Sequence, residues 1–284
     1  MNWSMTNDPA TFLAEAGTFL RTEPARNTTL LTVASTMLAV GATAFGTATD
    51  QAPVLGWWRS AAHVRGAFLQ TPPHPPVLTR LPPGAATALA TALADSGRTV
   101  SGVDAGQEEA VEFATQWSRL TGAASRGTER HRLYRLAALT PPQPAPEGHA
   151  RLASAEDRAT LISWYHAFDL DVGHDPTRNT ALVDDRIDHG GLMLWEVDGT
   201  PVAFAGRTRI VEGMSRVAPV YTPHQLRRRG YGGAVTTAIS QAALDGGATE
   251  VVLYTDLANP TSNALYQRLG YRPVEDRLLV SFTR

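Results

Sequence analysis

The chain of 284 residues contains no cysteine and no lysine, so all 25 of its basic residues are arginine. The lack of cysteine excludes a disulfide framework, a thiolate-bound zinc site and a cysteine nucleophile. Neither sign of charge dominates, because 27 acidic residues give a formal net charge of −2. A global field that would attract nucleic acid or an anionic membrane is therefore not expected.

A long apolar run is also missing. The longest, over residues 30–45, is interrupted by threonine and serine and is too short to cross a bilayer. An amphipathic segment over residues 12–20 precedes it, which does not fit the short basic start of a signal peptide. We therefore expect a cytoplasmic protein that has no membrane partner.

A proline-rich segment divides the chain. Four prolines stand between Thr140 and Gly148, and such a segment can join neither a helix interior nor a central strand. We predict a first domain over residues 1–139, a linker over residues 140–149 and a second domain over residues 150–284.

Hydrophobic periodicity predicts alternating helices and strands in both halves, and therefore an α/β (α+β) fold. The expected helices cover residues 30–38, 85–94, 108–120, 155–168, 231–244 and 260–269. The expected strands cover residues 54–58, 64–69, 100–103, 131–139, two segments around the turn at 198–199, 215–221, 250–254 and 278–282.

One local match indicates that the two halves are repeats. Gln70-Thr71-Pro72 matches Tyr221-Thr222-Pro223, and each Thr lies the same distance before the next apolar strand. This predicts duplication of one α/β unit. The alternative is that Thr-Pro after a strand is common turn chemistry. With this alignment, residues 72–76 stand where the second half has a glycine loop, and their prolines offer few N–H donors.

The glycine loop of the second half has the pattern Arg227-x-x-Gly230-x-Gly232 between a strand and an amphipathic helix. The first N–H groups of a helix have no partner within the helix and bind phosphate oxygens well. Glycines let the backbone approach a ligand closely, and Arg227, Arg228 and Arg229 add positive charge. The alternatives are a solvated surface or an RNA-binding patch that also uses Tyr231.

A second motif follows the apolar strand over residues 251–253. Asn259 suits a helix N-cap, Pro260 the first helical position and Gly270 the residue after the helix end. Ser262 and Tyr266 are four residues apart and share one face of this helix.

Together, in this order and at this separation, the two motifs resemble those of the GNAT superfamily of acyl-CoA-dependent N-acyltransferases. The resemblance covers residues 150–284, although the loop from Pro223 to Gly230 is one residue longer than in many members. It implies two tandem units, each a mixed, mostly antiparallel sheet flanked by helices. In the C-terminal unit a splayed pair of parallel strands would form the acyl-CoA cleft.

The resemblance also implies roles for individual residues. The strand end would pair with the pantetheine arm, the loop would hold the pyrophosphate, Asn259 would contact the arm, and Tyr266 would protonate the leaving thiolate. The backbone N–H of Val220 would stabilise the oxyanion. The residues expected to bind acetyl-CoA are Val220, Tyr221, Thr222, Arg227, Arg228, Arg229, Gly230, Tyr231, Gly232, Gly233, Asn259, Ser262 and Tyr266.

The general base is open. Glu196 and Asp256 are the candidates we place in the catalytic set with Tyr266, whereas Glu212 and His224 are weaker alternatives. For each carboxylate a surface or strand-end role is the competing interpretation. The aromatic residues Trp164, Phe168 and Trp195 would line an acceptor pocket or belong to the core.

The expected activity is transfer of an acyl group from acetyl-CoA, or another acyl-CoA, to the primary amine of a small molecule, without a metal. Without cysteine, direct attack in a ternary complex is the expected route. A protein N-terminus or lysine is the alternative acceptor, and a CoA-binding sensor is the alternative of another class. The N-terminal half would be a degenerate copy that binds no CoA. A homodimer is left open.

Overall fold

The structure, a computed structural model, describes residues 2–41, 45, 51–173 and 180–283, so residues 42–44 of the predicted apolar run lie outside it. Residue contacts divide the chain into two compact units. The first unit contains Met1–Leu133, Asp256–Ala258 and Val274–Arg284. The second contains Tyr134–Thr255 and Asn259–Pro273, so the proline-rich segment and the residues just before it belong to the second unit.

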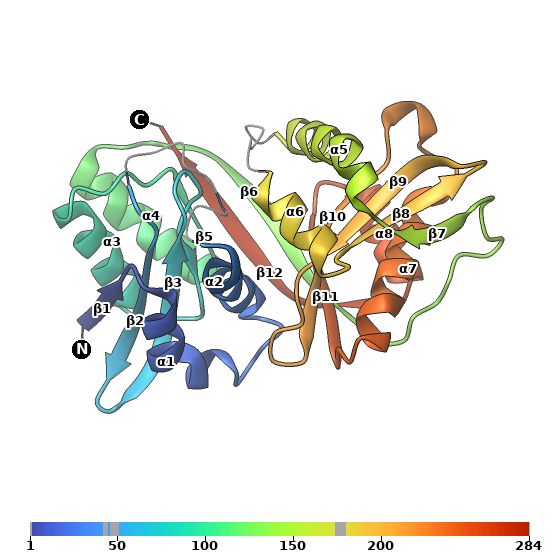
Figure 1. Cartoon of the computed structure of the whole chain (residues 1–284). Coiled ribbons are helices and arrows are strands. Elements are labelled where there is room, and N and C mark those ends of the chain that lie inside the picture. The colour runs from blue at the N-terminus through green and yellow to red at the C-terminus, as the bar shows by residue number, and fades with distance from the viewer. Residues whose placement is uncertain (1, 42–44, 46–50, 174–179, 284) are drawn as a thin grey trace. The chain divides into compact units, whose positions relative to one another are not determined.

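The first unit is a mixed, mostly antiparallel sheet with helices (Figure 1). Its strand order is β1-β2-β3-β4-β5-β12-β6. From β1 to β12 the described residues pair antiparallel, except that β4 and β5 run parallel. The strands are β1 (Asn2–Thr6), β2 (Val54–Ser60), β3 (His63–Gln70), β4 (Val77–Leu78), β5 (Gly102–Ala105), most of β6 (Ser125–Leu136) and most of β12 (Tyr271–Phe282). The helices are α1 (Pro9–Leu20), α2 (Thr28–Val40), α3 (Ala85–Asp95) and α4 (Gln107–Thr121).

The second unit has the strand order β11-β10-β9-β8-β7, in which only β10 and β11 run parallel. The strands are β7 (His149–Leu152), β8 (Leu192–Val197), β9 (Thr200–Arg207), β10 (Met214–Tyr221) and β11 (Glu250–Asp256). The helices are α5 (Arg158–Asp171), α6 (Ala181–Asp188), α7 (Tyr231–Asp245) and α8 (Pro260–Arg268), with short 3₁₀ turns at Ala155–Asp157 and His224–Leu226.

The two halves of the chain repeat one order of elements. A strand, two helices, three strands, a helix, a strand, a helix and a last strand occur from β1 to β6 and again from β7 to β12. This confirms the predicted tandem arrangement. The last strand of the second repeat, β12, pairs antiparallel with β5 of the first unit over Leu278–Ser281.

The element order corrects the predicted alignment of the repeats. Thr71 follows β3, whose counterpart is β9, whereas Thr222 follows β10, whose counterpart is β4. The match between the two Thr-Pro segments is therefore turn chemistry after non-equivalent strands. The true counterpart of the glycine loop is the segment 79–84 between β4 and α3, rather than residues 72–76.

The sheet of the second unit has an apolar core on each face, since successive strand residues point to opposite sides. Ala203 and Ala205 of β9 lie in the cluster that includes Val235 and Ile239 of α7. Phe204, between them in sequence, lies in the other cluster with residues of α5 and α6. Helix α7 therefore covers one face and α5 and α6 cover the other.

The predicted long elements lie within three residues of their expected ends, except that β6 begins six residues and β12 seven residues earlier than predicted. The amphipathic segment over residues 12–20 belongs to α1, which was not among the expected helices. The sequence prediction also missed β1, β4, β7 and α6, which have eight residues or fewer. None of the helices in the described part of the chain has the length and apolar character needed to cross a membrane.

Candidate functional site

Strands β10 and β11 separate partway along their length. They pair as parallel neighbours over Met214–Arg216 and Glu250–Val252, and the described residues form no further pairs between them. Strand β10 continues against β9 with a register shift between Val217 and Val220. Pro219 lies within that shift and has no N–H to donate to a ladder. The second half of β10 therefore offers backbone groups on the side that faced β11.

The loop after β10 leads into α7 through two residues with left-handed backbone. Arg228 has φ 65° and Gly230, the residue before α7, has φ 86°. Within the described residues, the backbone N–H groups from Arg228 to Gly233 donate no hydrogen bond to another residue. These six N–H groups lie at the positive end of the dipole of α7, which is the arrangement that binds a phosphate or pyrophosphate.

The two glycines that begin α7 have different surroundings. A Cβ at position 233 would lie 3.1 Å from Cδ1 of Leu265, so Gly233 lets α7 pack closely on α8. A Cβ at position 232 would have only Thr222 Oγ1 nearby, at 3.5 Å. Gly232 therefore serves an open approach to the backbone rather than packing.

The three arginines of the loop divide into two roles. Arg227 donates through Nε to the backbone oxygen of Thr222 at 2.9 Å, and its guanidinium pairs with Asp171 and lies 6.0 Å from the ring centre of Tyr221. Arg228 and Arg229 are exposed and have no partner among the described residues. Arg227 therefore fixes the loop, while the other two side chains can reach an anion.

Asp171, at the end of α5, anchors this loop and was not found from the sequence. Its carboxylate accepts from Arg227 and is 2.9 Å from Nε2 of His224. Partial burial raises the pKa of Asp171, but the hydrogen bonds from His224 and Arg227 outweigh it, so the net pKa is lowered. No sequence pattern joins residues 171 and 227, which are 56 positions apart.

Tyr266 lies in the core cluster of α7, β10 and β11, with 9% of its surface exposed. Its ring packs edge-on against Tyr271 at 6.1 Å, and its hydroxyl makes no hydrogen bond with a described residue. Burial raises the pKa of Tyr266 to about 12. By contrast, the hydroxyl of Tyr271 is 2.7 Å from Ser240 Oγ. Of these two tyrosines, Tyr266 has the proton that is available for chemistry.

Asn259 begins α8 as predicted. Its Oδ1 accepts from the backbone N–H of Ser262 at 3.0 Å, and Pro260 occupies the first helical position. The cap uses the oxygen of the amide, so the amide nitrogen of Asn259 remains for a ligand. Gly270 ends the helix with φ 99°, and a Cβ there would lie 1.8 Å from the oxygen of Ala138.

Each candidate base has a structural partner. Glu196 accepts from Nε of Arg151 at 2.5 Å, and Arg151 also binds Asp157 at 2.7 Å, which lowers the pKa of Asp157 to about 2. Asp256 accepts from the backbone N–H of Ala258 at 2.8 Å in the turn after β11.

The two weaker alternatives lie at turns. His224 is exposed and bound to Asp171, and Glu212 lies in a turn with φ 52°. Within the described residues no cluster of three His, Asp or Glu side chains that could hold a metal is present.

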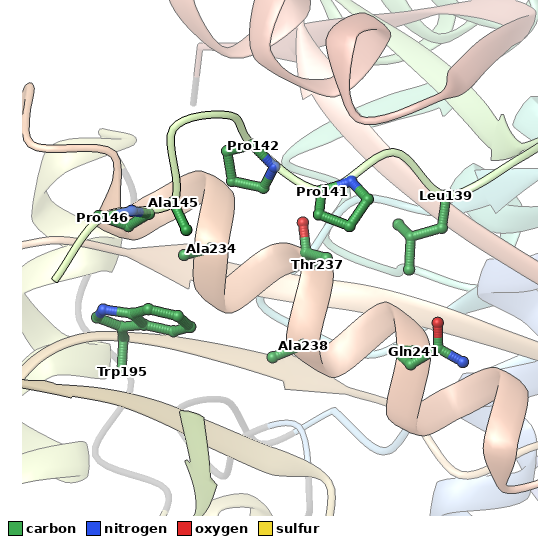
Figure 2. Close-up of a pocket in the computed structure, with 10 residues that line it drawn as sticks. All are labelled: Leu139, Pro141, Pro142, Ala145, Pro146, Trp195, Ala234, Thr237, Ala238 and Gln241. Carbon is green, nitrogen blue, oxygen red and sulfur yellow. The ribbon is translucent and has the colours of Figure 1, made fainter. Parts of the chain in front are cut away.

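The proline-rich segment packs on α7 beside the loop. Pro146 would contact a Cβ at position 230 at 3.4 Å, and Pro142 would contact one at position 233 at 3.8 Å. Trp195 Nε1 donates to the oxygen of Glu147 at 2.7 Å. Figure 2 shows the prolines on one side and α7 on the other of a cavity of about 350 Å³. The segment therefore braces the start of α7.

The three aromatic residues proposed for one acceptor pocket lie on different faces of the sheet. Trp164 stacks on Phe204 at 6.0 Å and, like Phe168, belongs to the cluster with α5 and α6. Trp195 packs against the cluster with α7. A single pocket lined by all three was a wrong prediction, since Trp195 is on a strand that points it to the opposite side.

Comparison with known proteins assigns one segment of the chain to a family. Residues 156–271 match the model of the acetyltransferase (GNAT) family. This segment is a GNAT domain. It contains the splayed strands, the glycine loop and Tyr266. The GNAT fold implies an acyl-CoA co-substrate, and the open amides before α7 and the separated strands β10 and β11 fit that group. No curated protein sequence matches the chain.

Solved structures resemble the chain over its whole length at low identity. A Drosophila protein has a TM-score of 0.69 at 12% identity and covers 99% of this chain and 98% of its own. A GNAT-family acetyltransferase from Colwellia psychrerythraea has a TM-score of 0.59 at 11% identity, with both chains fully covered. A tandem GNAT protein from the clavulanic acid biosynthesis pathway has a TM-score of 0.54 at 12% identity, over 99% and 98% of the chains. These matches show the tandem GNAT fold.

Proposed function

We propose that the protein is a cytoplasmic N-acetyltransferase that transfers an acyl group from acetyl-CoA to the primary amine of a small molecule. One observation carries the cofactor part of this proposal. The N–H groups from Arg228 to Gly233 have no acceptor among the described residues, and they lie at the start of α7 beside separated parallel strands. A diphosphate at the helix start and an extended arm along β10 would satisfy both sets of backbone groups.

The acyl group would pass directly to the amine, because the chain has no cysteine to carry it. The N–H of Val220, on the half of β10 that has left β11, would stabilise the oxyanion. The hydroxyl of Tyr266 would protonate the departing thiolate. Its raised pKa keeps this hydroxyl protonated at neutral pH, as an acid requires.

The amine must lose a proton before it attacks. We keep Glu196 and Asp256 as the proposed bases, with different support. Glu196 has 12% of its side chain exposed, and Arg151 occupies one of its carboxylate oxygens. For Glu196 to act as a base, Arg151 would have to release Glu196 while it stays bound to Asp157. Asp256 ends β11, and its carboxylate accepts from the N–H of Ala258 in the turn that follows.

In the first unit, the protein's own side chains occupy the places that correspond to the acyl-CoA site of the second unit. Arg277, 5% exposed, donates through Nη2 to the backbone oxygens of Leu78 on β4 and Asp104 on β5, at 2.9 and 2.8 Å. It thus occupies the gap between parallel strands that corresponds to the gap between β10 and β11. This supports the proposal that the first unit has no room for a pantetheine arm.

The N–H groups near the start of α3 in the first unit are likewise occupied by side chains of the protein. Glu109 accepts from the N–H of Leu81 at 3.2 Å, and Glu112 accepts from the N–H and the hydroxyl of Thr87 at 3.1 and 2.8 Å. Pro82 and Pro83 have no N–H. Carboxylates at this helix end would repel a phosphate, so we propose that only the second unit binds acyl-CoA.

The experiment that tests the activity is a screen of amine pools with acetyl-CoA, followed by release of free thiol, with Tyr266→Phe measured in parallel. Release that depends on a small amine supports the proposal, and release only with peptides favours the alternative acceptor, a protein N-terminus or lysine. CoA binding without release with any amine contradicts an enzyme and leaves a CoA-binding sensor. Gel filtration with light scattering tests whether the protein forms a homodimer.

A further inference from the structure

The first unit contains a cavity of about 840 Å³ that the acyl-CoA site does not use. Helix α1, the segment before α2, the turn between β2 and β3, the loop after β4 and one end of β12 line it. All of these segments belong to the first unit. The volume is within the range of pockets that hold small molecules.

The floor of this cavity is a fixed polar network. Arg277, Thr79 and Asn27 line it with 5%, 4% and 6% of their surfaces exposed. Thr79 Oγ1 accepts from the N–H of Ala67 at 2.9 Å, and Asn27 Nδ2 donates to the oxygen of Leu20 at 3.0 Å. Side chains held in this way present a pre-organised surface to a ligand.

Every acidic side chain in the cavity is already neutralised by an arginine. Glu15 pairs with Arg59, and Glu23 pairs with Arg26 at 2.9 Å. Glu275 pairs with Arg26 and lies 3.6 Å from Nη1 of Arg277. The carboxylates therefore do not offer a site for a cation.

Positive charge remains in excess, because five arginines and three glutamates line the cavity. Arg65 has no partner among the described residues, and Arg80 has only Glu275, at 3.9 Å, with 65% of its side chain exposed. His63 lies two residues before Arg65 on β3 and also lacks a partner within the described ranges. The cavity thus combines a rigid polar floor with unpaired donors at its rim.

We propose that this cavity binds a small organic anion through a carboxylate or phosphate group, with Arg65 and Arg80 as its direct ligands. A guanidinium offers two parallel N–H donors that match the oxygens of either group. The ligand is distinct from acyl-CoA, because Arg277, Glu109 and Glu112 fill the places in this unit that an acyl-CoA would need. The inference does not rest on the acetyltransferase activity.

The test is calorimetric titration of the full chain with citrate and, separately, with pyrophosphate, in the presence of saturating CoA so that the α7 site is occupied. The double variant Arg65→Gln/Arg80→Gln should bind about a hundredfold more weakly or not at all, because each of the two lost charge-assisted contacts costs about a factor of ten. The matched control Arg119→Gln/Arg126→Gln removes the same charge from exposed positions of the first unit and should bind like the wild type.

Binding of citrate indicates a carboxylate site, and binding of pyrophosphate indicates a phosphate site. Equal weakening in both double variants, or no binding of either probe to the wild type, would overturn the proposal. Thermal unfolding of both variants should match that of the wild type, since Arg65 and Arg80 make no close contact in the fold. If CoA itself fails to bind, the proposed acyl-CoA site is wrong. The affinities of the two double variants for citrate and pyrophosphate still test the proposed anion cavity.

Discussion

Gly230 and Gly84 hold the same place in the two repeats: each immediately precedes a helix, α7 or α3, and has φ of 86° or 81°. The turns are alike, but the groups around them differ. Gly230 is followed by open N–H groups. Gly84, by contrast, follows two prolines, and it precedes a helix start in which Glu112 accepts from the N–H of Thr87. The left-handed turn is common to both units, but of these two helix starts only that of α7 keeps open N–H groups that could take a phosphate.

The first prediction concerns this turn. Gly230→Ala places a Cβ on a left-handed residue, at a cost of about 1–2 kcal/mol, and moves the N–H groups that would hold the diphosphate. We expect CoA affinity, measured by calorimetry, to fall about tenfold. The matched control is Gly247→Ala, since Gly247 has φ 95° with no atom near its missing Cβ. It should lose similar stability but keep CoA affinity, and equal loss of affinity in both variants would contradict a phosphate role.

The second prediction separates catalysis from binding. Tyr266→Phe removes the only polar atom of a ring that packs on Tyr271, so the fold and the CoA affinity should persist. Turnover should fall about 10²-fold, the lower range for general acid catalysis. Steady-state kinetics and CoA titration measure the two quantities. Tyr271→Phe is the control, because its hydroxyl bonds Ser240, and it should reduce stability more than turnover. Unchanged turnover in Tyr266→Phe refutes the acid role.

The sequence was sufficient for the features that local chemistry determines. The cap at Asn259 and the left-handed end at Gly270 follow from the preferences of those residues at helix termini, and both are present. The start of α7 after Gly230 also follows from the motif. Such features need only neighbours within a few residues, so a single sequence carries them.

Features that join distant segments could not be predicted in this way. Asp171 anchors Arg227 only because the end of α5 meets the loop in three dimensions. Arg277 fills the gap between β4 and β5 because β12 pairs with β5, a partner that no pattern near residue 277 indicates. The alignment of Thr71 with Thr222 failed for a related reason, since β4 has two residues and no readable periodicity.

The third prediction tests the anchor of the loop. Asp171→Asn removes the charge that holds both Arg227 and His224, so the loop should become less ordered and KM for acyl-CoA should rise severalfold, with little change in kcat. Arg227→Gln should have a similar effect. If the two act as one pair, the double variant should be no worse than either single one, which a double-mutant cycle measures. Additive effects would show that Arg227 binds the ligand independently of Asp171.

The last prediction concerns the loss of stability at low pH through His189, the residue after α6. Burial, with the positive charge of Arg209, lowers the pKa of His189 to about 4, although Asp185 opposes the shift. Since the unfolded chain binds this proton near pH 6.5, unfolding takes up a proton between pH 6.5 and 4. The stability from neutral His189 is therefore complete above pH 6.5 and is lost as the pH falls toward 4, by about 3 kcal/mol at most.

His189→Gln should flatten this part of the curve of unfolding free energy against pH, measured in urea at several pH values. An NMR titration of the His189 ring with a midpoint near 6.5 would contradict the assignment, because a ring that protonates freely in the folded state contributes no such dependence.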